Sequence, residues 1–257
     1  MSGTIGELLA AACRRYRDRL ALVRGDETRS YGELLDHGAR VANALRELGL
    51  LPGTPVAAML EDRIASLEVY VGAAFGGYPV IHINDRLAAP EVAHILADSG
   101  ARALFHTDGR SEVVAAASAQ AELRLLVTIG AERPPGSMDF DELVSSARSA
   151  LQITARADGD LAIVGTTGLP KGAMISQRAL TDCVRLMPSM FRISSYGRCA
   201  FTGTLSFVSG IWGVILPHPY TGGTVTFLHP YTPESWVDHI EADQSTFTSA
   251  PTPRESS

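Results

Sequence analysis

The chain has few cysteines, and their positions exclude the usual cysteine-based scaffolds. Only three occur in 257 residues, Cys13, Cys183 and Cys199, and they stand far apart without a C-x-x-C pair. An odd number at such spacing is not typical of a disulfide framework or a zinc site. We therefore expect no metal centre built by the protein and a reducing compartment, the cytoplasm.

A long uninterrupted apolar run is also missing. The longest uncharged stretch, residues 69–84, is broken by glycines and by Pro79, which makes it a poor membrane helix. The N-terminus passes directly into an amphipathic, arginine-containing segment and lacks the apolar core of a signal peptide. These absences argue against a membrane span and against secretion.

Excess positive charge is absent as well. The formal net charge is −6, and the basic residues are scattered, which argues against nucleic acid as the main partner. A small anionic ligand in one local site stays compatible with this balance. With 46% hydrophobic and 19% charged residues, the chain can bury a sizeable core as one large or two small domains.

Two helix starts are marked by capping boxes. Thr4-Ile5-Gly6-Glu7 and Ser30-Tyr31-Gly32-Glu33 each place a carboxylate three residues after a hydroxyl, where the two side chains satisfy unpaired N–H groups. The first helix should reach about residue 17 and the second about residue 48, with Gly49 as a left-handed stop.

The rest of the chain alternates between apolar strands and helical patterns. Strands are predicted at residues 20–23, 55–60, 78–83, 102–105, 123–129, 198–202, 224–228 and 246–248. Helices are predicted at 66–75, 89–100, 111–120, 139–150 and 176–190, with another starting at 232. Such alternation favours an α/β fold with mostly parallel sheets flanked by helices in two lobes. A polar linker at 153–159 suggests segments 1–157 and 158–257.

A glycine- and threonine-rich segment follows the apolar run 161–164 and has the composition of an anion-binding loop. Small residues let backbone N–H groups turn inward, hydroxyls add donors, and a lysine adds a compact positive charge. Its spacing is not that of a Walker A loop. The residues concerned are Gly165, Thr166, Thr167, Gly168, Lys171 and Gly172.

This segment resembles the phosphate-loop signature of the adenylate-forming (AMP-binding) superfamily. The run Thr-Thr-Gly-Leu-Pro-Lys-Gly at 166–172, followed by Ala-Met-Ile-Ser-Gln-Arg, is similar to that of acyl-CoA synthetases, firefly-type luciferases and adenylation domains. Residues 29–34 are similar to the family's T-Y-x-E-L segment. Residues 77–101 resemble G-A-x-x-x-P-x-N-x-x-L and its continuation. His82 and His94 lack a partner motif, which favours packed or surface histidines over catalytic ones.

The resemblance implies the layered αβαβα N-terminal domain of that superfamily and an ATP-dependent carboxylic acid–CoA ligase. ATP, Mg²⁺ and coenzyme A would be the cofactors, and a fatty or other apolar acid the substrate. The loop residues would hold the β- and γ-phosphates. Segment 205–210 stands in the place of the family's L-x-H-x-x-G acyl-pocket segment, so we assign substrate binding to Phe207, Val208, Gly210 and Trp212. An ordinary buried helix explains this segment equally well. No catalytic residue is assigned.

The resemblance covers only the first part of the family's architecture. The family's adenine and ribose contacts, hinge and C-terminal lysine would lie beyond Ser257, so we expect no acyl-adenylate formation by this chain alone, whether it is a fragment or a natural truncation. Two alternatives stay open: a module that loads a carrier protein, and a non-catalytic domain. Uncovered apolar surface favours a homo-oligomer.

Three local departures accompany the resemblance. Roughly four residues are missing before Gly165, which would shorten the preceding strand by ~13 Å. A real deletion and a loop omitted from the sequence would look the same. Gln177 and Phe207 each stand where the family commonly has histidine. Phenylalanine cannot donate to a carboxylate, so we expect an altered acyl site.

Overall fold

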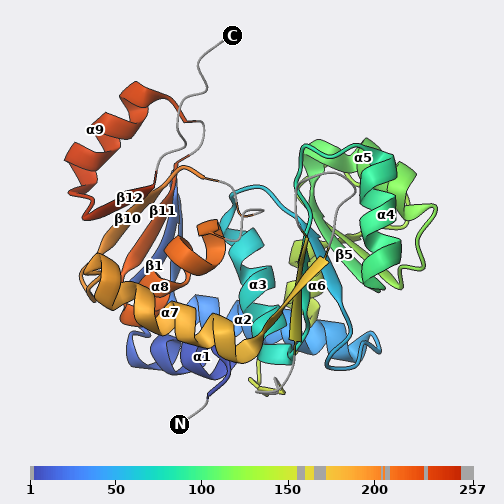
Figure 1. The fold of residues 1–257 in the computed structure, drawn as a ribbon, viewed down its shortest axis with the longest axis horizontal. Coiled ribbons are helices and arrows are strands. Elements are labelled where there is room, and N and C mark those ends of the chain that lie inside the picture. The colour runs from blue at the N-terminus through green and yellow to red at the C-terminus, as the bar shows by residue number, and fades with distance from the viewer. Residues whose placement is uncertain are drawn as a thin grey trace.

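Two five-stranded sheets organise the molecule, with helices packed between and outside them (Figure 1). The structure is a computed structural model and describes residues 3–154, 160–164, 172–203, 205, 209–228 and 231–249. The larger core fills the space between the sheets, and a second core covers the outer face of one sheet beneath α4 and α5. The predicted α/β class, with mostly parallel sheets flanked by helices, is confirmed.

The first sheet combines strands from distant parts of the sequence. Its order is β12-β10-β11-β1-β2, and every neighbouring pair is parallel except β1 with β2. Leu22 in β1 lies opposite Val225 in β11. The strands are β1 Leu20–Arg24, β2 Glu27–Ser30, β10 Arg198–Phe201, β11 Thr224–Phe227 and β12 Phe247–Ser249. This sheet therefore contains strands from both sides of residue 157, and the division into segments 1–157 and 158–257 stays a prediction.

The second sheet is parallel throughout, in the order β4-β3-β5-β6-β7. Its strands are β3 Val56–Met59, β4 Val80–His82, β5 Ala103–Thr107, β6 Leu125–Ile129 and β7 Met138–Asp139. Parallel strands present their carboxyl ends at one edge, which is where open α/β sheets bind ligands. A separate antiparallel hairpin, β8 Asp160–Val164 with β9 Gly172–Ser176, lies against β4.

The helices follow the predicted starts closely. Both capping boxes form, at Thr4 with Glu7 and at Ser30 with Glu33. The helices are α1 Ile5–Arg15, α2 Tyr31–Glu47, α3 Ile64–Gly76, α4 Ala89–Ser99, η1 Asp108–Arg110, α5 Ser111–Ser118, α6 Phe140–Ser146, α7 Gln177–Phe191, η2 Ser209–Ile215, α8 Pro217–Thr221 and α9 Pro233–Asp243. Within the described ranges, each helix is too short or too polar to span a bilayer.

Helices α2 and α3 cross closely between the sheets because glycines stand at the contact. A Cβ atom added at Gly72 would lie 2.5 Å from Cβ of Val41, and one added at Gly38 would lie 2.6 Å from Cγ1 of Val71. The buried carboxylate of Glu68 on α3 also accepts from Arg29 Nε at 2.6 Å. These contacts fix α3 in the centre of the molecule.

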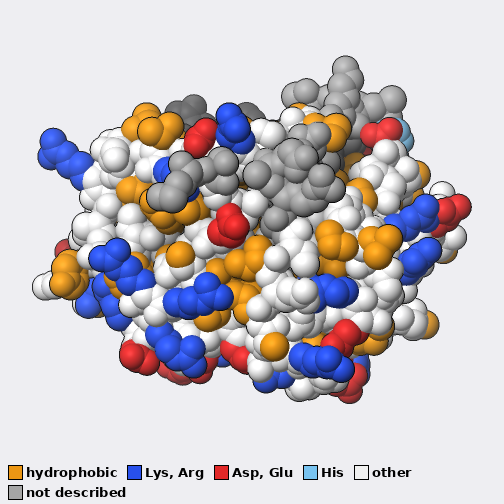
Figure 2. Space-filling view, turned by 90° about the horizontal axis from the view of Figure 1, so that it is seen from below, with side chains coloured by type: hydrophobic (Ala, Val, Ile, Leu, Met, Phe, Trp, Pro, Cys, Tyr) orange, Lys and Arg blue, Asp and Glu red, His pale blue; other side chains and the backbone are white. Residues whose placement is uncertain are grey.

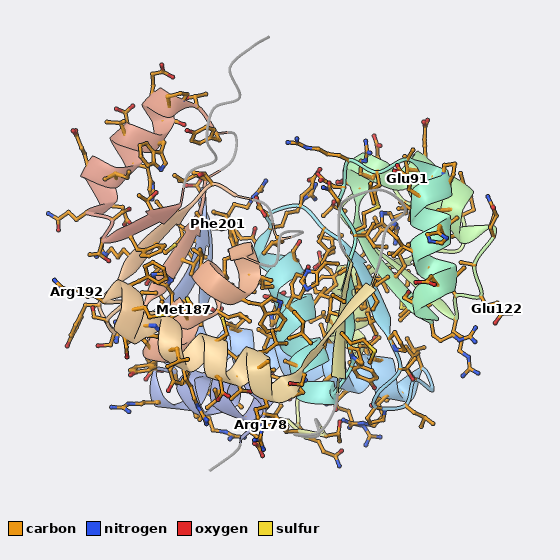
Figure 3. All side chains as sticks on the ribbon, in the orientation of Figure 1. Glu91, Glu122, Arg178, Met187, Arg192 and Phe201 are labelled. Carbon is orange, nitrogen blue, oxygen red and sulfur yellow. The ribbon has the colours of Figure 1, made fainter. Side chains whose placement is uncertain are left out.

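The underside of the molecule is mixed in character. Figure 2 shows basic and acidic side chains spread over this face between small hydrophobic areas. The basic side chains are also well separated along α7, because Figure 3 places Arg178 and Arg192 at opposite ends of this helix. On this face, charge of one sign does not gather into a stripe of the kind that binds a polyanion.

Candidate functional site

The hairpin β8–β9 carries the predicted phosphate loop. Gly165, Thr166, Thr167, Gly168 and Lys171 lie outside the described residues, and Gly172 is the first residue of β9. Val164 pairs with Gly172, and pairing continues along the hairpin to Asp160 with Ser176. The two strands therefore hold both ends of the loop segment together.

Ser176 and Gln177 connect this hairpin to α7. The Ser176 hydroxyl caps the helix by accepting from the backbone N–H of Ala179 at 3.3 Å. The side chain of Gln177 is buried, and its Oε1 accepts from the backbone N–H of Ile5 at 3.4 Å. Gln177 thus joins α7 to the start of α1.

The predicted acyl-pocket segment is described in part. Phe207 and Val208 lie outside the described residues, whereas Gly210 and Trp212 belong to the π-helix η2 and are both buried. The Trp212 ring lies edge-on to the imidazole of His82, with 6.4 Å between ring centroids. The structure therefore brings Trp212 together with the last residue of β4.

His82 is packed, as predicted, and His94 is exposed on α4. The imidazole of His82 stacks on Tyr70 of α3 at 5.0 Å, and its Nδ1 lies 3.0 Å from the Tyr70 hydroxyl oxygen. Burial lowers the pKa of His82 to about 4, so the ring is neutral near pH 7. A neutral imidazole can donate at one nitrogen and accept at the other.

Asp62 holds Leu205, the first residue of the predicted acyl-pocket segment. Its Oδ1 accepts from the backbone N–H of Leu205 at 2.9 Å, and its own carbonyl accepts from Arg24 Nε at 3.0 Å. Burial raises the pKa of Asp62 to about 7, against the opposing effect of the hydrogen bond from Leu205. Through its backbone carbonyl and its carboxylate, Asp62 links β1, the start of α3 and the segment after β10.

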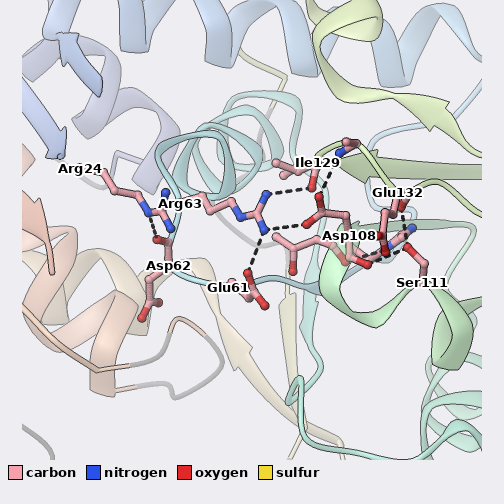
Figure 4. A network of polar contacts seen from close by, with 11 residues as sticks. Arg24, Glu61, Asp62, Arg63, Asp108, Ser111, Ile129 and Glu132 are labelled. Atoms are coloured by element: carbon pink, nitrogen blue, oxygen red, sulfur yellow. Dashed lines mark hydrogen bonds and ion pairs between the residues drawn. The ribbon is translucent and has the colours of Figure 1, made fainter. Parts of the chain in front are cut away.

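A network of charged side chains connects the carboxyl ends of three neighbouring strands in the second sheet (Figure 4). Arg63 donates to Glu61 at 3.0 Å and to Asp108 at 2.7 Å, and reaches the carbonyl of Ile129 at 3.3 Å. Although burial acts to raise it, the hydrogen bonds from Arg63 and Ala131 hold the pKa of Asp108 below its usual value. The network joins the carboxyl ends of β3, β5 and β6 and is structural in character.

A surface cavity of about 430 Å³ lies elsewhere, at the amino ends of β1, β10 and β11. Arg19 lines it and packs against the rings of Tyr16 and Tyr196, each 5.3 Å from the guanidinium carbon. It contains none of the predicted site residues. Its position at the amino edge of the sheet does not match the ligand-binding edge of α/β folds.

Sequence reasoning did not identify Asp62 or Tyr70 as neighbours of the candidate site. Asp62 carried a usable signal, because it follows strand 55–60 and the carboxyl ends of parallel strands gather at one edge. Tyr70 lies inside a helix of small and apolar residues and had no such signal. Among the described residues, His, Cys, Asp and Glu form no group of three or more that could hold a metal ion.

Comparison with known proteins places this geometry in a family. A model described as "AMP-binding enzyme" matches residues 9–253. Feruloyl-CoA synthase from Amycolatopsis sp. is 32% identical over 88% of this chain and 44% of its own length. Fatty acid–[acyl-carrier-protein] ligase ScoC from Streptomyces coeruleorubidus is 34% identical over 83% of the chain and 41% of its own length.

A solved structure has the same fold. The long-chain-fatty-acid-CoA ligase FadD1 from Archaeoglobus fulgidus superposes with a TM-score of 0.88 at 16% identity, over 96% of this chain and 51% of that one. The chain thus spans less than half the length of the two curated relatives and about half of this structure. The family match over residues 9–253 shows that the chain belongs to the AMP-binding enzyme family.

Proposed function

We propose that this chain supplies the phosphate-loop half of an ATP-dependent carboxylic acid–CoA ligase. The observation that carries the proposal is the Gly/Thr-rich segment with Lys171, held by the paired ends of β8 and β9 in a chain that matches the AMP-binding family over residues 9–253. The named relatives act on ferulate and on fatty acids. An apolar or aromatic acid is therefore the proposed substrate class.

In this proposal the chain binds phosphate and orients the acid. Backbone N–H groups of Gly165, Gly168 and Gly172 and the hydroxyls of Thr166 and Thr167 would hold the β- and γ-phosphates of ATP. Lys171 would offset the charge that develops on the departing pyrophosphate. Mg²⁺, when bound, supplies further charge neutralisation. Gly210 and Trp212 would line the acid site together with Phe207 and Val208.

The overall reaction joins the acid to a thiol in two steps. The carboxylate attacks the α-phosphorus of ATP, which forms the acyl-adenylate and releases pyrophosphate. The thiol of coenzyme A then attacks the acyl carbon and displaces AMP. The protein's proposed contribution is position and electrostatic field rather than a nucleophile.

Lys171→Ala in the complete reading frame tests the loop assignment. Loss of one charge-assisted contact costs about 1.5–3 kcal/mol, so kcat/KM for ATP should fall about 10- to 150-fold while the KM for the acid changes little. ATP–pyrophosphate exchange measures both. Arg178→Ala, which removes an exposed cation at the start of α7, is the matched control and should leave kcat/KM for ATP unchanged. A rise in the KM for the acid alone would show that the loop does not bind ATP.

A carrier-protein thiol is the second candidate acceptor. The similarity to ScoC, a ligase that uses an acyl carrier protein, favours it. Transfer assays with coenzyme A and with a phosphopantetheinylated carrier protein, run on the same acyl-adenylate, distinguish the two acceptors.

A further inference from the structure

Leu205, the first residue of the predicted acyl-pocket segment, is held at both of its backbone groups. Its N–H donates to Oδ1 of Asp62 at 2.9 Å. Burial lowers the pKa of His82, and a hydrogen bond with the backbone of Leu205 acts to raise it. A bond that raises the pKa of an imidazole is one in which the ring donates, so the backbone partner is the Leu205 carbonyl. The two contacts form a clamp on Leu205, whose side chain is fully buried.

His82 also contacts the far end of the same segment. Its ring lies edge-on to the Trp212 ring, with 6.4 Å between the ring centroids. Its Nδ1 lies 3.0 Å from the hydroxyl oxygen of Tyr70, which fixes the imidazole against α3. Residues 205 and 212 are therefore held around one buried imidazole, and residues 206–211 come between them in the sequence.

The surroundings of Asp62 disfavour a charged carboxylate. Burial raises its pKa most, and the negative charges of Asp85 and Glu61 add to that effect. The N–H of Leu205 and the charge of Arg24 act in the opposite direction. An acid at this position thus costs folding free energy when it ionises, and what it supplies is an acceptor for an N–H group 143 residues away. Stability alone does not account for this side chain, whose contact points to a role in placing the segment.

We propose that Asp62 and His82 are positioning residues of the acid site, which fix the two ends of the segment formed by residues 205–212. The inference rests on the proposed function, because only there is this segment assigned to the acid. Each residue acts through Leu205 or Trp212 rather than on the reacting atoms, since ligand-binding residues need supporting contacts that hold them in place. Loss of the clamp should weaken use of the acid and spare use of ATP, because β8 and β9 hold the predicted phosphate loop.

Kinetics of Asp62 variants in the complete reading frame test the role in the acid site. Asp62→Ala removes the acceptor, so the KM for the acid should rise about tenfold while the KM for ATP stays within about twofold of the parent value. Asp62→Asn keeps an oxygen that can accept from the N–H of Leu205 and should keep the parent KM for the acid. ATP–pyrophosphate exchange with ferulate or dodecanoate as the acid gives these constants.

Two further variants complete the set. Asp98→Ala removes an exposed carboxyl group on α4 and is the matched control, which should change neither KM. His82→Leu removes the other contact of the clamp and is the second variant if Asp62→Ala does not fold. It should show the same split, with a raised KM for the acid and little change in the KM for ATP.

Hydrogen exchange at the Leu205 amide measures the clamp without any substrate. In the 257-residue chain, Asp62→Ala should accelerate exchange of this amide about tenfold or more, because its acceptor is lost. Asp62→Asn should keep the protection of the parent chain. Nuclear magnetic resonance follows this single amide.

Each outcome bears on a different step. Unchanged protection of Leu205 in Asp62→Ala would overturn the clamp. Faster exchange at Leu205 with an unchanged KM for the acid would overturn the positioning role, and so would an equal rise of both KM values, which indicates general loosening of the fold. Absence of ATP–pyrophosphate exchange in the parent enzyme would remove the proposed function and the acid-site role with it, while Leu205 exchange would still decide whether Asp62 holds the segment.

Discussion

At the residue scale, burial shifts the pKa of two titratable side chains that contact the predicted acyl-pocket segment, Asp62 and His82. Desolvation disfavours the charged form of each, so the pKa of Asp62 rises to about 7 and that of His82 falls to about 4. Both side chains are consequently able to be neutral near pH 7.

Asp62→Asn should remove a loss of folding stability that the parent chain shows as the pH rises from about 4 to about 7. The folded carboxyl holds its proton up to about pH 7, whereas the group's ordinary pKa is 3.8, so the native state binds more protons between these values. Stability contributed by this group is present below pH 3.8 and falls as the pH rises to about 7, with a slope of up to about 1.4 kcal/mol per pH unit. Asparagine does not titrate and can still accept from the N–H of Leu205.

Urea unfolding at pH 5 and pH 8 measures the effect. The free-energy difference between the two pH values should shrink in Asp62→Asn and stay as in the parent chain in Asp98→Asn, an exposed carboxyl on α4. The same pH dependence in Asp62→Asn and the parent chain would mean that Asp62 titrates normally.

Sequence alone could identify the loop residues but not the buried polar groups. Gly165, Thr166 and Lys171 form a contiguous run, so their chemistry is visible without a fold. Tyr70, His82 and Trp212 come from three distant segments, and only the packing of α3, β4 and η2 brings their rings together. A residue whose role depends on a tertiary neighbour has no local signature.

At the element scale, strong local signals predicted where helices begin. Where α6 ends, and where β9 and η2 form, depends on tertiary contacts. The capping boxes at Thr4 and Ser30 confirm both predicted helix starts. The helix predicted at 139–150 ends earlier, at Ser146, with Ala147 in an extended conformation. Strand β9 was not predicted, because its five residues carry little pattern of their own and pair only with β8. The π-helix η2 likewise depends on its packing.

Gly72→Ala should destabilise the fold although alanine favours helices. The new methyl group would meet Cβ of Val41 at 2.5 Å and the carbonyl oxygen of Gly38 at 3.0 Å, and a β-branched side chain and a helix backbone can yield little. Overpacking of this kind costs about 1–3 kcal/mol, whereas the gain in helix propensity is at most about 1 kcal/mol.

Thermal and urea unfolding measure the difference in stability. Gly213→Ala is the matched control, because no described atom lies within 4 Å of a Cβ added there. It should be neutral or slightly stabilising. An equally stable Gly72→Ala chain would show that α2 and α3 can separate without cost, and the close crossing would then not hold the two sheets together.

At the scale of the whole molecule, burial is distributed unevenly. Almost every residue of α3 is buried between the two sheets. Helix α9 is the opposite case, since none of its described residues is buried, and it follows the edge of the first sheet beside β10 and β12. Figure 1 shows α9 standing away from the body of the molecule. Local opening should therefore begin at this end of the chain.

Native-state hydrogen exchange tests this gradient with an internal control. Helices α4 and α9 each have 11 residues and a proline in the first turn, and in each the backbone N–H of the N-cap residue donates to a side chain three residues on, Glu91 or Ser235. They differ in packing, because α4 buries Val92, Ala93, Ile95 and Leu96 whereas α9 buries none of its described residues. Amides of α9 should exchange about tenfold faster or more than those of α4, and α3 should be slowest, because opening a helix that buries few apolar contacts costs little free energy. Equal protection of α4 and α9 would mean that α9 is held by contacts that the described residues do not supply, for example by self-association. In that case, dilution of the protein should restore the faster exchange of the α9 amides.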